Sequence, residues 1–466
     1  MTRLNFIEIA GLLGSRRARA LLGVILISAS VQLGACNSGQ IGNGNNDGGG
    51  GGDGGDMSDQ PGYCSGKGPP IKVGDVNGTG GKCAGQVAAT AFRYGLCTCQ
   101  GLSAPSTVTI DAFDSTRPGP LTMGSGGSAG MNQNVNTSQK LSVGGNLQVA
   151  GALTVPDVYV GTDMLLASDL NANTSADIRR DAQINGDVKC NGPSGSLKIA
   201  RTLTYPIGKT LQATSPMIGN TVRAAVNVPA PCDCAPNAIF DIAGYVQGRS
   251  TDNDNSVVAL DPARLENFSV DTSLDFSCGR FYLNRIGGSG TLTWNVNGRT
   301  AVFVGGDVNV KTWTINLGPN GELDLFINGG LTSSAALNFG NINAPARVRV
   351  YMGGSRNINV AAGSVFGGNI YAPESALVPG GSFEVYGAVF VRSFNPSGPV
   401  LIHHDIAILH ADDDCTPATG GTTSCSSCRD CGGQACKGTA CGACTGDADC
   451  CAPLFCRGGQ CIYEAG

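Results

Sequence analysis

The chain of 466 residues carries 30 lysines and arginines against 35 aspartates and glutamates, which gives a net charge of −5. This acidic balance argues against nucleic acid as a partner. Glycine, at 71 residues, is about twice its usual share, and charged residues, at 14%, fall well below the usual quarter. The composition is typical of secreted, turn-rich β proteins.

The amino terminus has the layout of a cleaved lipoprotein signal over residues 1–35. Several arginines precede the apolar segment 20–33, which is shorter than the roughly 20 residues that a spanning helix requires. The tetrad Leu33-Gly34-Ala35-Cys36 follows and resembles the lipobox of bacterial lipoproteins. The resemblance implies lipidation of Cys36 and attachment to a membrane. Because Asn rather than Asp follows the cysteine, we expect the outer membrane or the cell surface of the envelope.

A tether follows the lipidated cysteine, and the two together occupy residues 36–60. The segment consists largely of Gly, Asn and Asp, so it offers too little apolar surface to fold alone. By random-coil scaling it spans about 25–30 Å. The alternative is an ordinary secretory signal, which leaves Cys36 free or in a disulfide.

Export makes disulfides the expected state of the other cysteines. The candidates are Cys64, Cys83, Cys97, Cys99, Cys190, Cys232, Cys234, Cys278, Cys415, Cys425, Cys428, Cys431, Cys436, Cys441, Cys444, Cys450, Cys451, Cys456 and Cys461. This set is odd in number, so one cysteine stays unpaired or pairs outside the chain. The Cys-X-Cys pairs at 97/99 and 232/234 lack the spacing and histidines of a zinc site, and we predict no metal and no cofactor.

The folded part divides into three regions. The sequence of residues 61–137 predicts a small cap stabilised by disulfides, with a helix over 84–94. Residues 138–414 are predicted to form a β-solenoid-like module, and residues 415–466 a disulfide domain.

Short strands punctuated by glycine define the region 138–414. Apolar and polar residues alternate between turns, and an apolar stretch ending in Gly-Gly recurs at 302–306, 326–330 and 350–354, at intervals of 24 residues. One turn of a β-helix requires about three short strands, which this interval accommodates. The pattern predicts a mainly β fold, a right-handed parallel β-helix or solenoid. A β-sandwich is the alternative.

The tail is dense in cysteine between Cys425 and Cys461. Such a segment relies on disulfides, each contributing roughly 2–4 kcal/mol, in place of a hydrophobic core. Its adjacent Cys450 and Cys451 resemble the small knotted and colipase-like disulfide modules of secreted proteins. No ligand follows from that resemblance.

No catalytic residue is predicted. Glu322 and Asp324 lie on one face of a strand, as a pair of carboxylates for acid–base work would. The histidines at 403, 404 and 410 lie on one segment beside Asp405, but strand geometry divides them between two faces.

The stretches Asn369–Pro373 and Tyr386–Val389 resemble uncharacterised β-rich modules of secreted and anchored bacterial proteins, and the whole layout resembles surface lipoproteins of myxobacterial type. The resemblance implies fold and location without chemistry. We therefore expect a non-enzymatic envelope lipoprotein with a structural or adhesive role, whose partner is a polysaccharide or a surface protein. The alternatives are a polysaccharide-active β-helix enzyme and a carrier for a secreted disulfide-rich effector domain.

Overall fold

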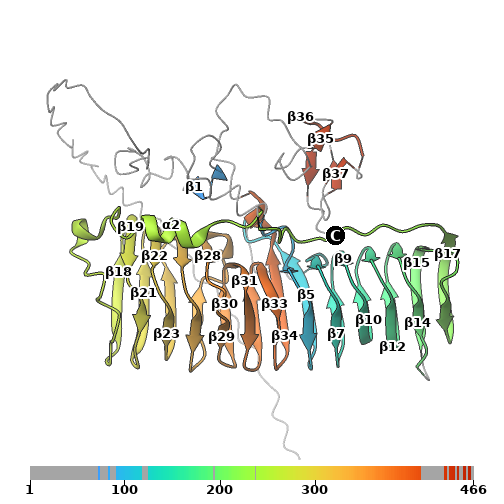
Figure 1. Ribbon diagram of the computed structural model, residues 1–466, viewed down its shortest axis with the longest axis horizontal. Coiled ribbons are helices and arrows are strands. Elements are labelled where there is room, and N and C mark those ends of the chain that lie inside the picture. Colours follow the sequence, from blue (N-terminus) through green and yellow to red (C-terminus); the bar gives the residue numbers. More distant parts are fainter. Residues whose placement is uncertain are drawn as a thin grey trace, which may run out of the picture. The chain divides into compact units, whose positions relative to one another are not determined.

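The computed structural model is a parallel β-solenoid of about 13 turns, with little helix (Figure 1). This confirms the predicted fold class and excludes the sandwich. The structure describes residues 72–73, 82–83, 91–117, 124–192, 195–236, 238–410, 435–437, 440–446, 449–450, 455–457 and 460–462. The predicted signal, Cys36 and the tether lie outside these residues.

Parallel pairing stacks the strands of the solenoid in three columns, whose members follow in order along the stack. Column A contains β19 (Gly279–Leu283), β22 (Arg299–Val304), β25 (Glu322–Ile327), β28 (Val348–Met352), the first parts of β31 (Asn369–Pro379) and β33 (Val389–Phe394), β3 (Leu96–Thr98), β6 (Ala129–Met131), β9 (Leu147–Val149), β11 (Met164–Leu166), β13 (Ala182–Ile184), and the second parts of β15 (Ser196–Tyr205) and β17 (Ser215–Arg223).

Columns B and C complete each turn. Column B contains β20 (Ile286–Gly287), β23 (Val308–Val310), β26 (Leu331–Ser333), β29 (Ile358–Val360), the second parts of β31 and β33, β4 (Leu102–Ala104), β7 (Val135–Thr137), the first parts of β10 (Leu153–Val160) and β12 (Leu170–Ile178), β14 (Val188–Cys190) and β16 (Leu211–Ala213). Column C contains β18 (Thr272–Phe276), β21 (Thr291–Val296), β24 (Thr312–Leu317), β27 (Asn338–Gly340), β30 (Ser364–Gly367), β32 (Phe383–Tyr386), β34 (Val400–Asp405), β5 (Val108–Phe113), β8 (Leu141–Val143), the second parts of β10 and β12, and the first parts of β15 and β17.

The order of the turns along the stack differs from their order along the chain. The first turn, β3 to β5, lies in the middle, and the N arm (β3–β17) grows from it in one direction. A return segment, residues 224–241, then runs back along the stack to the opposite end (Figure 1). From there the C arm (β18–β34) grows toward the middle, where β34 pairs with β5 and β33 with β3. The two arms therefore form one continuous solenoid.

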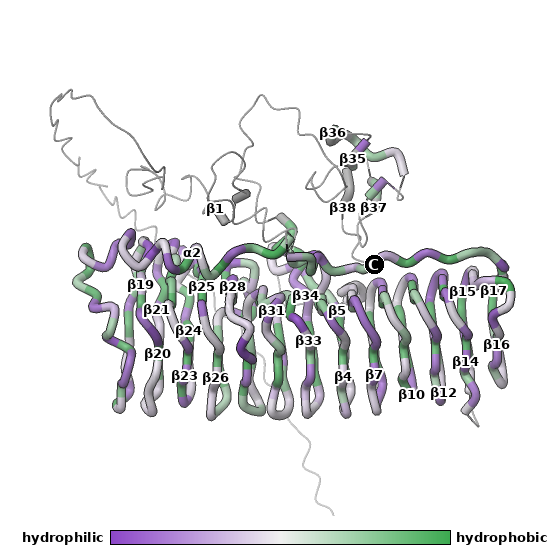
Figure 2. Tube along the Cα trace, in the orientation of Figure 1, coloured by the Kyte–Doolittle hydropathy of each residue, from purple (hydrophilic) through white to green (hydrophobic). Residues whose placement is uncertain are grey.

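Hydrophobic and hydrophilic residues alternate along many of the strands (Figure 2). Because successive side chains of a strand point to opposite faces, the hydrophobic ones fill the core of the solenoid. In the N arm, side chains at matching positions stack as aliphatic rows, such as Leu147 on Met164 and Leu166 on Ile184. In the C arm the core holds rings, and Trp294 packs on Trp313 with centroids 4.6 Å apart.

Turn length varies within both arms, since paired positions lie 17 residues apart at Leu153 and Leu170 and 23 apart at Val188 and Leu211 in the N arm, and 17 apart at Phe383 and Val400 in the C arm. In the N arm the Asp163 carboxylate accepts the backbone N–H of Asp181, 18 residues later. In the C arm the Asp307 carboxylate accepts the N–H of Gly330, 23 residues later. The Gly-Gly repeat found in the sequence does mark successive turns of the C arm, because the strands that precede it pair with one another, Phe303 with Phe326 and Phe326 with Tyr351.

The start of the solenoid differs from the expected boundary. The solenoid begins at β3, well before residue 138, so Cys97 and Cys99 belong to its first turn and not to a separate cap. The helix expected over 84–94 lies mostly outside the described residues, and residues 92–95 form a turn. The sequence missed the first turn because its strands are short and lack the repeat of the C arm.

The remaining elements are small. They are α2 (Ile242–Gly248), η2 (Asn255–Val258), η3 (Pro345–Arg347), η4 (Ile406–His410), and the antiparallel pairs β1 (Lys72–Val73) with β2 (Lys82–Cys83), β35 (Ala435–Lys437) with β36 (Ala440–Gly442), and β37 (Phe455–Arg457) with β38 (Gln460–Ile462). In the tail, Cys444 and Cys456 form a disulfide. Among the described residues, no helix has the length and apolarity to cross a membrane.

Candidate functional site

Part of the outer surface of column A is covered by the return segment. Along the N arm, Val226 and Val228 are buried against it, and the Gln148 amide donates to the Pro229 carbonyl at 2.8 Å. At Gly130 any Cβ would lie 2.9 Å from Pro231, so glycine there lets the return segment approach. The return segment therefore covers column A at β6 and β9, whereas Gln183 on β13 is exposed.

Along the C arm, α2 covers an aromatic row on column A. The helix begins at Asp241, whose carboxylate accepts the N–H of Gly244 at 2.8 Å, as an N-cap does. Tyr245 packs edge-on against Phe303 and Phe326, with centroids 5.4 and 5.2 Å away. A Cβ on Gly353 would lie 2.6 Å from the helix backbone, which explains one glycine of the repeat by close packing.

The two Cys-X-Cys pairs join the return segment to the first turn. Cys97 is bonded to Cys232 and Cys99 to Cys234, each across 135 residues of sequence. All four sulfurs are therefore oxidised and none is available to a metal. These bonds fix the return segment where the two arms meet.

Cys190 is not in a disulfide, although the sequence placed it among the candidates. It is a free thiol that points into the core of the N arm from β14, among aliphatic side chains. Burial raises the pKa of this thiol. An inward-facing position on a regular strand puts the sulfur out of reach of the surface cysteines, which corrects the prediction for this residue.

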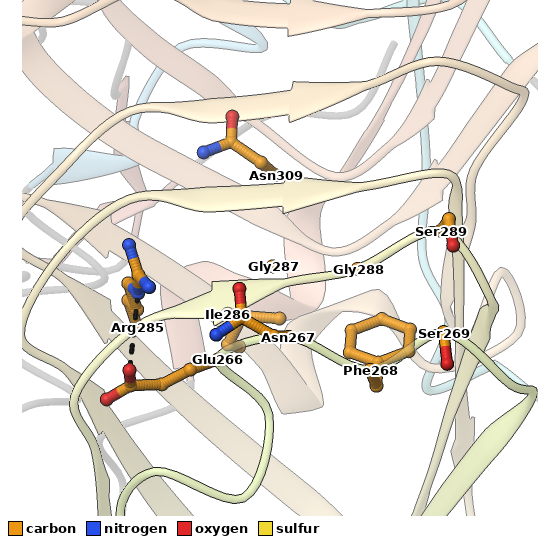
Figure 3. Close-up of a pocket in the computed structure, with 10 residues that line it drawn as sticks. All are labelled: Glu266, Asn267, Phe268, Ser269, Arg285, Ile286, Gly287, Gly288, Ser289 and Asn309. Carbon is orange, nitrogen blue, oxygen red and sulfur yellow. Dashed lines mark ion pairs between the residues drawn. The ribbon is translucent and has the colours of Figure 1, made fainter.

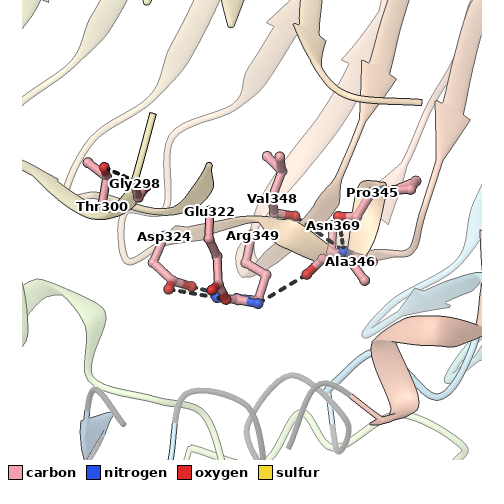
Figure 4. Close-up of polar contacts among 9 residues, drawn as sticks. All are labelled: Gly298, Thr300, Glu322, Asp324, Pro345, Ala346, Val348, Arg349 and Asn369. Carbon is pink, nitrogen blue, oxygen red and sulfur yellow. Dashed lines mark hydrogen bonds and ion pairs between the residues drawn. The ribbon is translucent and has the colours of Figure 1, made fainter. Parts of the chain in front are cut away.

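The carboxylates of Glu322 and Asp324 both bind one buried arginine, Arg349 (Figure 4). Asp324 and Arg349 are 0% and 3% exposed, and the guanidinium donates to both oxygens of Asp324 at 2.6 and 2.8 Å. It also pairs with Glu322 and donates to the Ala346 carbonyl at 3.0 Å. Burial opposes ionisation of Glu322, but Arg349 outweighs it and lowers the pKa of that carboxyl. Held this way, neither group is placed to exchange a proton with a substrate.

His403 lies on the outer surface of column C, where the arms meet. Its Nδ1 is 2.6 Å from Asp111 Oδ1 and its Nε2 is 3.4 Å from Glu384 Oε1. The Tyr386 hydroxyl donates to the same Glu384 oxygen at 2.8 Å. Burial lowers the pKa of His403, but the hydrogen bond and charge of Asp111 outweigh it, and the pKa is raised. The cluster ties the last strand of the C arm to the first turn.

His404 and Asp405 have separate structural partners. His404 is fully buried, its Nε2 lies 3.0 Å from the Phe92 carbonyl, and burial lowers its pKa to about 4. Asp405 accepts from the backbone and hydroxyl of Ser115 at 2.9 and 2.7 Å. The side chain of the third histidine, His410, lies outside the described residues. The structure thus does not bring His403 and His404 into one ligand set.

Column B presents a long polar row to solvent. Outward side chains at matching positions are Asn309, Thr332 and Asn359 in the C arm, and Ser103, Asn136, Thr154, Asn171, Lys189 and Gln212 in the N arm. Most are exposed, and all but the lysine are uncharged amides or hydroxyls. The apolar Val378 of β31 follows Asn359 and interrupts the row between the arms. Because neighbouring parallel strands lie about 4.8 Å apart, the row repeats at that spacing.

Two adjoining hollows open on column B in the C arm. The first, of about 430 Å³, is lined by Glu266, Asn267, Phe268, Ser269, Arg285, Ile286, Gly287, Gly288, Ser289 and Asn309 (Figure 3). The second, of about 410 Å³, is lined by Asp307, Asn309, Gly330, Thr332, Arg356, Asn357 and Asn359. Asn309 belongs to both, so the two shallow hollows adjoin at this residue of the polar row, and together we call them the groove.

The groove was not predicted from the sequence, although the sequence contains a signal for it. Two of the three Gly-Gly pairs of the repeat are followed within a few residues by a short strand with a polar residue between two apolar ones, Val308-Asn309-Val310 and Ile358-Asn359-Val360, and the third is followed by Leu331-Thr332-Ser333. Period-two alternation puts that middle residue on the outer face. Only the register between turns, which joins these residues into one row, required the structure.

Comparisons with known proteins locate a match in the C arm. A family model described as a domain of unknown function (DUF7305) matches residues 232–410, which include α2 and the whole C arm. A solved structure, an ice-binding protein from an Antarctic Flavobacteriaceae bacterium, aligns at 11% identity over 72% of this chain and 99% of its own, with a TM-score of 0.16. No curated protein matches the chain significantly.

Proposed function

We propose that the protein is a non-enzymatic lipoprotein of the cell envelope, which uses the solenoid as a rigid structural or adhesive element. The polar row on column B supports this most directly. It is an uncovered, repetitive and nearly neutral surface, whereas column A is covered in part by the return segment and α2. Repetition favours binding to something that itself repeats, such as a polymer or a surface.

The location rests on the residues around Cys36. The Leu33-Gly34-Ala35-Cys36 tetrad, the apolar segment before it and the tether after it support lipid attachment at the outer membrane or cell surface. The disulfides of the first turn fit an oxidising compartment. The TM-score of 0.16 is too low to transfer ice binding to this chain.

The enzyme alternative is less favoured by the geometry. The most suggestive carboxylates, Glu322 and Asp324, are both paired with Arg349, and Asp324 is fully buried. An acid–base pair needs access to a substrate and at least one group free to change protonation. The groove on column B contains Glu266 and Asp307, and each is paired with an arginine.

Membrane fractionation of cells expressing the full chain tests the proposal. We expect the protein in the membrane pellet, labelled by a palmitate analogue, and we expect Cys36→Ser to abolish labelling and release it. Purified protein without the lipid should sediment with isolated cell envelopes and leave envelope polysaccharides uncleaved. Unlabelled protein in the soluble fraction, failure to sediment with envelopes, or bond cleavage in a polysaccharide panel would each overturn the proposal.

A further inference from the structure

We propose that the groove on column B of the C arm binds a neutral polysaccharide chain that lies along the stack of turns. This inference rests on the proposed adhesive function and names its ligand class. The groove combines a row of neutral hydrogen-bonding side chains with a rim whose charges are already compensated.

The floor of the groove offers hydrogen bonds at a regular interval. Asn309, Thr332 and Asn359 occupy matching positions on three successive turns, and all three are exposed. An amide both donates and accepts, as does a hydroxyl. At the strand spacing of about 4.8 Å, one such group meets each successive sugar ring of an extended chain, whose hydroxyls likewise both donate and accept.

The charges at the rim select against an anionic polymer. Arg285 lies 3.5 Å from Glu266 Oε2, and the exposed Arg356 is paired with Asp307. Each guanidinium therefore already has a carboxylate partner. An acidic chain would have to displace those carboxylates, whereas a neutral chain can accept from the remaining N–H groups without disturbing either pair.

One end of the groove is lined by Phe268 beside Ser269 and Ser289 (Figure 3). The ring is only 8% exposed and packs in the core, so the hydrogen bonds of the floor, and not this ring, provide the contact with the sugar chain. The groove is shallow and open along the stack, which fits a polymer better than a small enclosed ligand.

Affinity electrophoresis of the full chain tests this, with soluble β-glucan or xyloglucan in the gel as neutral probes and polygalacturonate as the anionic one. We expect retardation by a neutral probe and little by polygalacturonate. The triple variant Asn309→Ala/Thr332→Ala/Asn359→Ala should weaken neutral binding at least tenfold. The matched control, Ser273→Ala/Thr293→Ala/Thr314→Ala, removes polar side chains at matching positions on column C of the same arm, and it should bind within threefold of wild type.

A second variant addresses specificity without altering the floor. Glu266→Gln/Asp307→Asn removes both rim carboxylates and retains their hydrogen-bonding capacity, so Arg285 and Arg356 become uncompensated. We expect its affinity for polygalacturonate to rise at least fivefold. An unchanged affinity for that probe would contradict the role assigned to the rim.

The outcomes separate this inference from the proposed function. One outcome is that the triple variant of the floor folds normally, as judged by an unchanged circular dichroism spectrum, and still binds envelopes. That result would overturn the groove as the binding site and leave the adhesive role intact. Loss of all envelope binding in the wild type would overturn the adhesive role first. Thermal hysteresis in place of polysaccharide binding would assign the row to ice and overturn the inference.

Discussion

The N arm and the C arm share three columns and one register, yet they enclose different cores. Among the described residues, the N-arm core is aliphatic up to Tyr205 at its far end, whereas the C arm buries Trp294, Trp313 and Phe339. A ring occupies more volume than an aliphatic branch, and protein cores are close-packed. The same three columns therefore accommodate both kinds of core. Turn length does not distinguish the arms, because Leu153 pairs with Leu170 in the N arm and Phe383 with Val400 in the C arm, both 17 residues apart.

The arms also differ in how column A is covered. In the N arm an extended chain crosses small or polar positions such as Gly130 and Gln148, and hydrogen bonds hold it there. In the C arm a helix covers stacked rings, with Phe303 and Phe326 centroids 5.0 Å apart. A helix is wide enough to bury an aromatic row, whereas an extended strand approaches only where side chains are small.

Removing a ring from the C-arm core should have the largest effect. Trp313 is fully buried and packs on Trp294 and Phe339, so Trp313→Ala should lower the free energy of unfolding by about 4–5 kcal/mol. Urea denaturation measures this, with Thr332→Ala on the outer face of the same arm as control, expected within about 0.5 kcal/mol. A loss below about 1 kcal/mol for Trp313→Ala would show that the ring does not fill the core.

Breaking the buried ion pair beneath α2 should cause the second-largest loss of unfolding free energy. Asp324→Ala leaves Arg349 buried without its bidentate partner and should cost about 3–4 kcal/mol of unfolding free energy. The pair at the open groove is the control: Asp307→Asn should cost no more than about 1 kcal/mol, because that pair is solvent-exposed. Equal losses would contradict the distinction between covered and uncovered columns. Asp324→Leu/Arg349→Met should recover most of the stability.

The histidines that join the arms should make stability depend on pH in opposite directions. The pKa of His404 falls to about 4 in the folded state from 6.5, so its contribution is present above pH 6.5 and is lost as the pH falls toward 4. That loss amounts to about 3 kcal/mol. His404→Gln should remove this part of the acid sensitivity in urea titrations at about pH 7 and about pH 4.5.

His403 should make stability depend on pH in the opposite direction. Its pKa is raised, so its contribution is complete below about pH 6.5 and is lost as the pH rises through the folded value. His403→Gln should therefore destabilise the protein more at about pH 6 than at about pH 9. The same dependence in both variants would mean that the two rings do not have the assigned environments.

The hydrogen bonds between aspartates and the backbone of the next turn in the N arm should contribute less to stability. Asp181 Oδ1 accepts the backbone N–H of Thr202 at 2.9 Å, and Asp181→Ala should cost about 1 kcal/mol. Asp181→Asn retains an acceptor and should be milder. A thermal melt compares the two, and identical melting temperatures would show that water replaces the bond at no cost.

Cys190 offers a probe of the N arm with almost no effect on stability. The thiol is buried and its pKa is raised, so an alkylating reagent should modify it only when the N arm opens. Labelling rates in Trp313→Ala and wild type would show whether the arms unfold together. A rate unchanged by the C-arm substitution would indicate that the N arm opens independently.

Several features could be predicted because they depend on neighbours in the sequence. Alternation over a few residues and the interval of 24 at Gly-Gly indicated a β-solenoid, since both follow from the geometry of one strand and one turn. The sequence also predicts part of the polar row, because alternation places the middle residue of each short strand on the outer face. The beginning of the solenoid could not be predicted, because Leu96–Thr98 and its neighbours gain their stability from strands on both sides that are distant in the sequence.

The sequence alone determined the kind of fold, because strand period and turn spacing are local properties. The tertiary structure decided the order of the turns, since Ser115 and Asp405 meet across 290 residues and no local pattern encodes that contact. It also decided that Glu322 and Asp324 are locked by Arg349, that Cys190 stays reduced, and that Asn309, Thr332 and Asn359 form one groove. Each depends on which surfaces the long-range packing covers and which it leaves open.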